Sequence, residues 1–264
     1  EAAGLPVFGP TSSAARIETS KSFAKSLMAR HGIPTGRAAV FDDYATAKEY
    51  VRGESLPLVV KADGLAAGKA VTVASTGEEA LDALRDCLVD RRFGDAGERV
   101  LIEECMEGPE VSVFAFVDGE RVSDLVAACD YKRVGDGNTG PNTGGMGSYS
   151  PPQEALWGPD VERRVREGIM EPAVQALADE GAPYRGVLYA GLMLTEDGPR
   201  VVEFNCRLGD PESQVVLPRL KTDLLDAMMA TAEGDLSGIR FEWDDRHCVG
   251  IVMASGGYPG EHTT

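Results

Sequence analysis

The sequence predicts a mixed α/β protein with two lobes. Apolar segments of strand length alternate along the chain with amphipathic segments of helical period. Some strand-like segments follow one another with only a turn between them, which predicts hairpins as well as strand–helix units. The chain has 264 residues, of which 43% are hydrophobic. A chain of this length and composition can bury a substantial core.

The first half of the chain predicts a regular succession of elements. Residues 4–11 have the pattern of a short strand that ends in a Gly-Pro turn. A helix capped by Thr19 or Ser20 is expected to run to about Arg30, because apolar residues then share one face. The segments after it are expected to form a strand, a helix, two strands around a glycine-rich loop, an amphipathic helix and two more strands, at 37–41, 44–52, 56–62, 70–75, 77–90, 99–105 and 110–119.

The second half begins with a long polar stretch at 131–152. The remaining elements are expected to be a long helix, a β-hairpin, a helix that ends at a glycine and a final strand, at 160–181, 185–205, 224–234 and 247–255. Pro172 lies inside the long helix and should bend it, because proline lacks the backbone N–H that the helix needs.

The net charge of −17 excludes some classes of partner. A nucleic-acid-binding protein needs a basic surface, and an anionic membrane attracts one, so neither partner is expected. The sequence contains no apolar run of about 18 residues, and its first residues do not resemble a signal peptide. An anionic small molecule stays possible, because a few lysines and a divalent metal can reverse the potential inside a cleft.

Cysteine usage predicts a reducing compartment. The five cysteines, Cys87, Cys105, Cys129, Cys206 and Cys248, are widely spaced and form no C-x-x-C pair. Neither a zinc site nor a disulfide framework is therefore indicated. We expect buried free thiols and a cytoplasmic location.

The stretch "KADGLAAGKAV" at 61–71 raises the question of a phosphate-binding P-loop. A P-loop requires the pattern G-x-x-x-x-G-K-[S/T] and a helix directly after it. Here Gly64 and Gly68 are one residue too close, and Ala70, which follows Lys69, cannot bind magnesium. The segment after the loop alternates β-branched and small residues and therefore predicts a strand. These three differences exclude a P-loop.

The same loop fits a flap between two strands. Glycines would allow the backbone N–H groups of residues 64–69, here called the flap, to approach phosphate oxygens closely. Lys61, at the end of the preceding strand, could supply a fixed positive charge. Taken alone, the loop fits an ordinary glycine-rich hairpin with a surface lysine equally well.

The segment "VVEFNCR" at 201–207 is the candidate metal site. Its alternation places Val201, Glu203 and Asn205 on one face of a strand and Val202, Phe204 and Cys206 on the other. Two oxygen ligands about 7 Å apart along a strand suit Mg²⁺ or Mn²⁺. Arg207 falls on the same face, where it could neutralise a transferring phosphoryl group. An ordinary edge strand with a solvated polar face would show the same alternation.

Two further segments contain candidate substrate contacts. "RLGDPES" directly follows the strand expected at 201–207, here called the metal strand, and adds Asp210 and Glu212 in a turn. The polar stretch contains six glycines from 135 to 147 and the basic pair Lys132–Arg133, in an otherwise acidic chain. It could be a loop folded around an anionic substrate or a disordered linker.

In their order along the chain, these pieces resemble the ATP-grasp superfamily, in which two lobes, each with a β-sheet and helices, clasp ATP. More closely, "KADGLAAGKAV", "YKRVGDGNTGPNTGGMGSYSP" and "VVEFNCRLGDPESQ" resemble the phosphoribosylamine–glycine ligase family of de novo purine biosynthesis. The resemblance extends from about Phe8 to Tyr258. The chain departs from the usual family pattern at Ala70, where glycine is common, and at Ser213, where threonine is common.

The resemblance implies that this chain is the central part of a longer protein. Residues 1–20 would be the end of a preceding domain, and residues 236–264 the start of a closing domain. Between them, residues 21–108 would form the small ATP-grasp lobe with the flap. Residues 109–235 would form the large lobe with the metal site. A first residue that is not methionine fits this expectation.

The resemblance also implies roles for individual residues. Lys21 and Lys61 match the lysines that contact phosphate, and Arg207 matches a residue beside the transferred phosphoryl group, so Lys61 and Arg207 are the expected catalytic residues. Glu203 and Asn205 match the metal ligands. The residues expected at the flap, the adenine hinge and the ribose are Gly64, Gly68, Lys69, Glu103, Glu104, Met106 and Glu110. The residues expected near the other substrates are Lys132, Asn142, Gly144, Gly145, Met146, Gly147 and Asp210.

The implied activity is a ligase that joins glycine to 5-phosphoribosylamine, using ATP and Mg²⁺ or Mn²⁺. In this family glycyl phosphate is the activated intermediate, and a monomer or weak homo-oligomer is the expected assembly. Two alternatives remain open. One is another ATP-grasp carboxylate–amine ligase, and the other is an ATP-binding fragment that is inactive without its missing domains.

Overall fold

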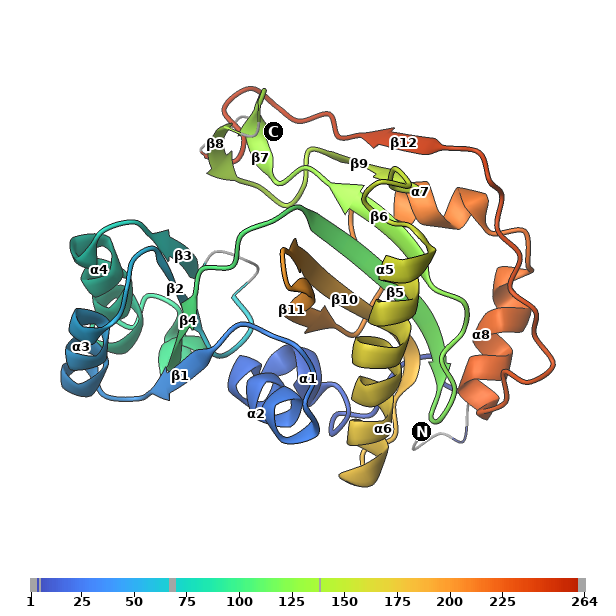
Figure 1. Cartoon of the computed structure of the whole chain (residues 1–264), viewed down its shortest axis with the longest axis horizontal. Coiled ribbons are helices and arrows are strands. Elements are labelled where there is room, and N and C mark those ends of the chain that lie inside the picture. The colour runs from blue at the N-terminus through green and yellow to red at the C-terminus, as the bar shows by residue number, and fades with distance from the viewer. Residues whose placement is uncertain (1–3, 5, 67–69, 138, 261–264) are drawn as a thin grey trace.

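The computed structural model describes residues 4, 6–66, 70–137 and 139–260 and contains two lobes (Figure 1). The smaller lobe is built on a four-stranded sheet and the larger lobe on a six-stranded sheet. Neighbouring strands in both sheets run antiparallel. The predicted mixed α/β fold with two lobes is confirmed. Within the described ranges, none of the helices has the length and apolar character needed to span a bilayer.

The smaller lobe has its own hydrophobic core. Its strands are Ala38–Phe41 (β1), Leu58–Ala62 (β2), Val71–Ala74 (β3) and Val100–Glu104 (β4), in the order β1-β4-β2-β3. Its helices are Tyr44–Gly53 (α3) and Gly77–Leu88 (α4), with a short 3-10 helix at Gly94–Gly97. Apolar side chains of α3 and α4 pack against β2 and β4. Helix α4 is the amphipathic helix that the sequence predicts, and a capping box between Thr76 and Glu79 starts it.

The larger lobe is organised around two long central strands. Its sheet contains Glu110–Asp118 (β5), Val126–Asp130 (β6), Gly147–Ser150 (β9), Arg185–Thr195 (β10), Gly198–Asn205 (β11) and Cys248–Ile251 (β12), in the order β11-β10-β5-β6-β9-β12. A two-stranded hairpin, Arg133–Gly135 (β7) and Thr139–Asn142 (β8), extends from it. Strands β10 and β11 form the hairpin that the sequence predicts.

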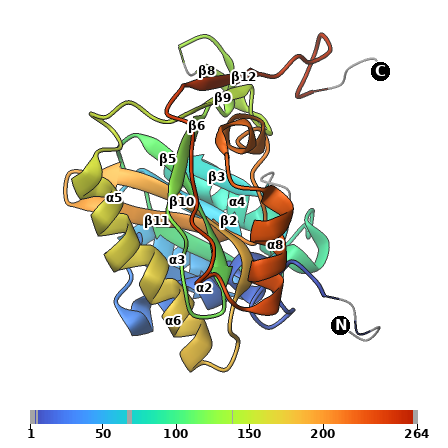
Figure 2. The same cartoon turned by 90° about the vertical axis from the view of Figure 1, so that its right-hand side faces the viewer.

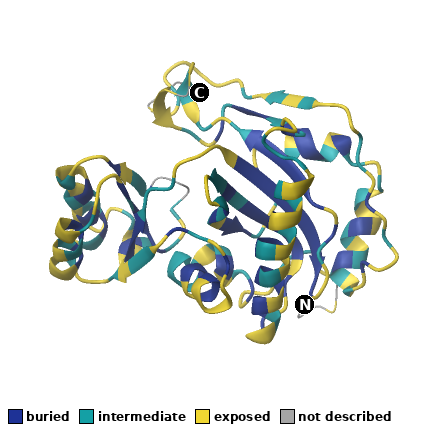
Figure 3. Cartoon of the chain, in the orientation of Figure 1, coloured by how far each residue is buried: buried dark blue, intermediate teal, exposed yellow. Residues whose placement is uncertain are grey.

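Helices cover both faces of the larger sheet (Figure 2). One face packs against Arg16–Thr19 (α1), Lys21–His31 (α2), Pro159–Val165 (α5) and Glu171–Asp179 (α6), and the other against Ser213–Val216 (α7) and Leu224–Glu233 (α8), with a 3-10 turn at Leu217–Arg219. Strand β5 divides its side chains between the two cores: Val113 faces the first, and Phe114 and Phe116 face the second. The central strands β5 and β10 are accordingly buried along most of their length, whereas the edge strand β12 is partly exposed (Figure 3).

The long predicted helix is present but has a π-helical segment in its middle. Residues Arg166–Met170 form π-helical turns between α5 and α6, and Pro172 lies in the first turn of α6. Proline has no N–H to donate to the preceding turn, and a π turn changes the hydrogen-bond register at that point. The chain therefore accommodates Pro172 without ending the helix.

Two expectations about the elements are wrong or incomplete. The described residues of 4–11 form no strand, because Pro6 and Pro10 lack the N–H groups that a ladder requires. Strand β6 was not predicted, because small residues such as Ala127 and Ala128 have weak strand propensity and are fixed here by the neighbouring strands β5 and β9.

The expectation of buried free thiols is only partly met. The cysteines are all free, but only Cys87 and Cys129 are buried.

The two connections between the lobes are attached to the β10–β11 hairpin. On the segment that enters the smaller lobe, the carbonyl of Pro34 accepts a hydrogen bond from the N–H of Val201, at 2.8 Å. On the segment that leaves it, the carbonyl of Pro109 accepts from the N–H of Leu194, at 2.9 Å. The position of the smaller lobe is thus set by one hairpin of the larger lobe.

Gly108 should be essential to the second of these attachments. It has a φ of +147°, and a Cβ there would overlap the carbonyl oxygen of Leu194. We expect Gly108→Ala to lower the free energy of unfolding by about 1–3 kcal/mol, measured by urea denaturation. The control is Gly53→Ala, because Gly53 has an ordinary φ and open space around it. Equal stability of the two variants would contradict this account of the hinge.

Candidate functional site

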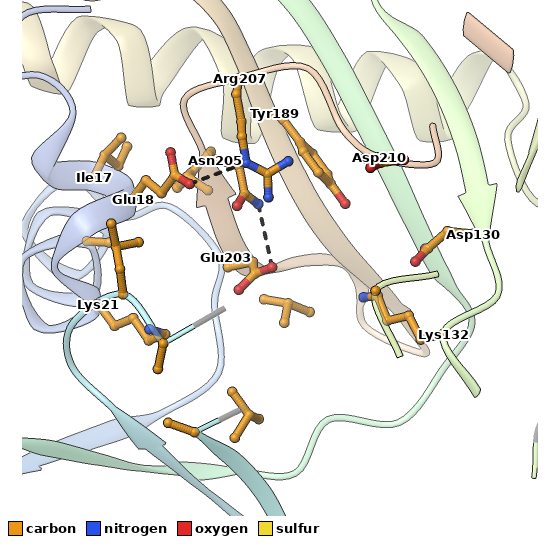
Figure 4. Close-up of a pocket in the computed structure, with 18 of the residues that line it drawn as sticks. Ile17, Glu18, Lys21, Asp130, Lys132, Tyr189, Glu203, Asn205, Arg207 and Asp210 are labelled. Atoms are coloured by element: carbon orange, nitrogen blue, oxygen red, sulfur yellow. Dashed lines mark hydrogen bonds and ion pairs between the residues drawn. The ribbon is translucent and has the colours of Figure 1, made fainter. Parts of the chain in front are cut away.

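A cavity of about 480 Å³ is lined by residues from both lobes. Segments far apart in the sequence meet here: α1 and α2, the start of β3, β6, and the end of β11 (Figure 4). The predicted site residues that line it are Lys21, Glu103, Lys132, Gly144, Glu203, Asn205, Arg207 and Asp210. Figure 4 shows Glu203 and Asn205 between Lys21 on one side and Lys132 on the other.

Glu203 and Asn205 project from the same face of β11, as predicted. The Nδ2 atom of Asn205 lies 3.5 Å from the Oε1 atom of Glu203, and Asn205 is buried whereas Glu203 is exposed. The strand faces predicted for Val201 and Val202 are wrong. A β-bulge leaves Val202 without a partner opposite, so Val201 packs in the core and Val202 lines the cavity. Bulges turn a strand locally, and this one lies directly before the candidate ligands.

Arg207 follows the strand and lies at the rim of the cavity. Its side chain is 57% exposed, and its Nε atom lies 3.7 Å from Oε1 of Glu18. The other carboxylate oxygen of Glu18 accepts a hydrogen bond from the N–H of Cys206, at 2.7 Å. Glu18, on α1, therefore fixes the backbone next to Arg207 and limits where its guanidinium group can reach.

A buried cluster of charges occupies the small-lobe side of the cavity. The Oε2 atom of Glu103 lies 3.0 Å from Nζ of Lys61 and 3.1 Å from Nζ of Lys25. Lys61 is 6% exposed and does not line the cavity directly. Lys21 lies closer to the open space, where its ammonium donates to the carbonyl of Gly64 at 3.0 Å. Burial lowers the pKa of Lys21, against the opposing effect of Glu203.

The described part of the flap is held by Lys21, through the carbonyl of Gly64, and by the 3-10 helix at Gly94–Gly97. Gly64 donates its N–H to the carbonyl of Ala96, and a Cβ at this position would lie 2.8 Å from Cα of Ala96. In this structure the Gly64 N–H is therefore used by protein, and glycine is required by close packing. Gly68 and Lys69 lie outside the described residues.

Of the expected hinge and ribose residues, Glu103 lines the cavity, whereas Glu104, Met106 and Glu110 do not. Glu104 and Met106 line separate surface hollows, and the carboxylate of Glu104 accepts from the Arg37 N–H and from Arg200, each at 2.9 Å. Glu110 is ion-paired with Lys132, with 2.6 Å between Oε2 and Nζ. Burial opposes the positive charge of Lys132, but Glu110 and Asp130 outweigh that effect and raise its pKa.

The polar stretch is folded in the part that the structure describes, which argues against a disordered linker. The N–H of Thr143 donates to the carbonyl of Lys132, and the N–H of Met146 to that of Tyr131. Gly145 has a φ of +122° and packs against Pro211, and Gly147 pairs with β12. Of the predicted substrate residues in this loop, Gly144 lines the cavity, whereas Asn142, Gly145, Met146 and Gly147 do not.

Several cavity residues were not singled out by the sequence. Lys25 lies one turn after Lys21 on α2, and a lysine among apolar helix positions was a signal for it. Asp130 ends the unpredicted strand β6, so its place could not be foreseen. Glu212 was named from the sequence, but its contacts were not: it is buried and accepts hydrogen bonds from Ser112 and Tyr189, on two strands distant in sequence. Only the fold brings these groups together.

Comparison with known proteins agrees with this geometry. The family described as phosphoribosylglycinamide synthetase, ATP-grasp (A) domain, matches residues 19–213. The phosphoribosylamine–glycine ligase of Vibrio parahaemolyticus is 51% identical over 261 residues, which are 98% of this chain and 60% of the relative. The chain thus spans about 60% of the length of the curated relatives it matches.

Solved structures give the same result. The crystal structure of phosphoribosylamine–glycine ligase from Thermotoga maritima has a TM-score of 0.89 and 34% identity, and the match covers 97% of this chain and 64% of the other. A biotin carboxylase–β,γ-ATP complex from Campylobacter jejuni has a TM-score of 0.71 and 19% identity, covering 94% and 53%, and shows the ATP-grasp fold alone. The chain therefore belongs to the phosphoribosylglycinamide synthetase family, and it contains that family's ATP-grasp domain.

Proposed function

We propose that the protein is an ATP-dependent ligase that joins glycine to 5-phosphoribosylamine, giving glycinamide ribonucleotide, ADP and phosphate. The observation that carries the proposal is the meeting of Glu203, Asn205 and Arg207 with Lys21 and Lys132 around one cavity. Family membership supports the choice of substrates. Because the chain spans about 60% of its relatives, the activity is proposed for the protein together with its remaining segments.

ATP would place its phosphates at the lysine-rich side of the cavity. Lys21 and Lys61 would supply positive charge there, and residues 64–69 would close over the triphosphate. The adenine and ribose contacts proposed for Glu103, Glu104, Met106 and Glu110 require changes from this structure. In particular, the Glu110–Lys132 ion pair would have to open before Glu110 accepts a hydrogen bond from ribose.

The residues of β11 fit a hard divalent cation. Glu203 offers a carboxylate and Asn205 an amide oxygen from one strand face, and Mg²⁺ commonly takes few protein oxygens together with water and phosphate. Within the described residues, no group of three or more His, Cys, Asp or Glu side chains is arranged to hold a metal. A site completed by phosphate oxygens therefore fits these residues better than an all-protein site. When bound, the cation would offset phosphate charge.

The chemistry asks the protein mainly for positioning and charge neutralisation. A carboxylate is a poor acyl electrophile, so the γ-phosphoryl group of ATP would pass to the glycine carboxylate and form glycyl phosphate. Arg207 and Lys61 would offset the charge that develops during this transfer. The amine of phosphoribosylamine would then attack the activated carbonyl and release phosphate. Closure of the flap would keep water from hydrolysing the acyl phosphate.

The side of the cavity opposite the α2 lysines would receive glycine and phosphoribosylamine. Lys132 and Asp210 would lie near these substrates, together with the loop from Asn142 to Gly147. We also propose a cytoplasmic protein that is a monomer or weak homo-oligomer, without nucleic-acid or membrane partners. The domain boundaries at 20, 108 and 235 stay predictions.

The reaction can be tested by the substrate dependence of ADP release. We expect ADP only when ATP, glycine and phosphoribosylamine are all present, because the acyl phosphate is consumed by the amine. Release with another amine or carboxylate would instead favour a different ATP-grasp ligase. The comparison should include a protein of the relatives' full length. ATP binding without turnover in this chain, but turnover in the longer one, would assign only the nucleotide site to this segment.

Glu203→Gln tests the metal assignment. Loss of the charged ligand should lower ADP formation about 100-fold or more, measured at saturating ATP and glycine. The matched control is Glu196→Gln, because Glu196 is exposed at the turn of the same hairpin and should be silent. Near-normal turnover of the Glu203 variant would show that β11 does not hold the cation.

The carboxyl group of Asp130 should make the stability of the protein depend on pH. Burial raises the pKa of the Asp130 carboxyl from its ordinary value of 3.8 to about 6, although the charge of Lys132 acts in the opposite direction. Between these values the folded protein holds a proton that the unfolded chain has lost, so this group's contribution to stability falls as pH rises from 4 to 6.

We therefore expect Asp130→Asn to gain stability relative to the wild type over that pH range, by about 1–3 kcal/mol in urea denaturation. Asp136→Asn is the control, since Asp136 is exposed in the nearby β7–β8 hairpin. A constant difference between wild type and Asp130→Asn from pH 4 to 6 would contradict the prediction.

A further inference from the structure

Lys25 is a buried cation that the proposed reaction does not use. It is 9% exposed and lies on α2, one turn after Lys21. Its ammonium group has three acceptors: Oγ1 of Thr35 at 2.8 Å, the carbonyl of Gly36 at 2.9 Å and Oε2 of Glu103 at 3.1 Å. An ammonium has three N–H donors, so every donor of Lys25 is engaged. Lys25 could contact a ligand only by giving up one of these bonds.

One of these bonds controls the charge around Lys61. The same Oε2 atom of Glu103 accepts from both Lys25 and Lys61, and its Oε1 atom is buried without a hydrogen-bond partner among the described residues. Two ammonium groups thus share one carboxylate, which leaves a net positive charge at this end of the cavity. Without Lys25, Glu103 would neutralise Lys61 alone and could draw its ammonium into a one-to-one pair.

Another bond leads from Lys25 to the metal strand. The hydroxyl of Thr35 accepts from Lys25 and donates to the carbonyl of Val201 at 2.7 Å. Val201 also donates its N–H to Pro34, and Thr35 and Val201 form a parallel bridge. Val201 directly precedes the bulged residue Val202 and then Glu203. Lys25 is therefore connected, through one hydroxyl, to the backbone that aims the candidate metal ligand.

We propose that Lys25 is a positioning residue that sets the charge beside Lys61 and the orientation of Glu203 together. This inference rests on the proposed function, because it assumes that ATP and a divalent cation occupy the cavity. Lys25 acts through Glu103 on the phosphate side and through Thr35 on the metal side. In this proposal Lys25 itself makes no contact with a reacting atom.

The test separates the effect on the phosphate side from the effect on the metal side. It measures ATP affinity by calorimetry, once in Mg²⁺ and once in EDTA. Thr35→Val removes the hydroxyl but keeps the side-chain shape, and Thr35→Ser keeps the hydroxyl. We expect Thr35→Val to reduce the enhancement of ATP affinity by Mg²⁺ about tenfold, and Thr35→Ser to retain it. We expect Lys25→Met to weaken ATP binding in EDTA as well, since it also acts on Glu103 and Lys61. Lys221→Met, at an exposed lysine, is the control.

The outcomes are distinguishable. If neither this chain nor a protein of the relatives' full length binds ATP, the proposed function is wrong and, with it, this inference. If the wild type binds ATP with a Mg²⁺ enhancement and both Thr35→Val and Lys25→Met retain wild-type values, the inference is wrong while the proposed function stands. Thermal unfolding identifies a variant that fails to fold. The Thr35 pair decides the metal side even if Lys25→Met does not fold, because valine has nearly the shape of threonine and serine lacks only one methyl group.

Discussion

The β10–β11 hairpin is the constraint on which the rest of the structure depends. Its inner end carries Glu203 and Asn205, and its edge is bonded to both chain segments that connect the lobes, through Pro34 and Pro109. The smaller lobe therefore takes its position from the same hairpin that positions the candidate metal ligands. Antiparallel pairing with β5 holds the hairpin rigid, because β10 is buried between two cores.

The electrostatics of the cavity contrast with those of the whole chain. The protein carries a net charge of −17, yet Lys25 and Lys61 share the buried carboxylate of Glu103 on one side of the cavity, and Lys21 lies on that side too. A local excess of positive charge in a partly enclosed site is worth more than the same charge at the surface, since water screens it less. An acidic protein can in this way attract a polyphosphate to one place and repel it elsewhere.

The sequence predicted most elements because their signals are local. The helix cap at Ser20, the amphipathic helix α4 and the β10–β11 hairpin are formed by neighbouring residues, and each was found where expected. The elements that were missed depend on distant partners. Strand β6 is a strand because β5 and β9 flank it, and the bulge at Val202 exists because β10 sets the register opposite. Simple alternation could not locate that bulge, and so it assigned Val201 and Val202 to the wrong faces.

The sequence by itself determined which chemical groups are present and which family they resemble: a strand with Glu203-x-Asn205-x-Arg207, a lysine-flanked glycine loop and a long glycine-rich polar loop. Short-range spacing is enough for this, because strand geometry fixes which neighbours share a side. Tertiary structure alone decided which groups meet. It placed Lys25 and Lys61 on one oxygen of Glu103, and joined Lys25 to the metal strand through Thr35. Those contacts join residues up to 166 positions apart, and only the packing of two lobes onto one hairpin brings them within hydrogen-bond distance.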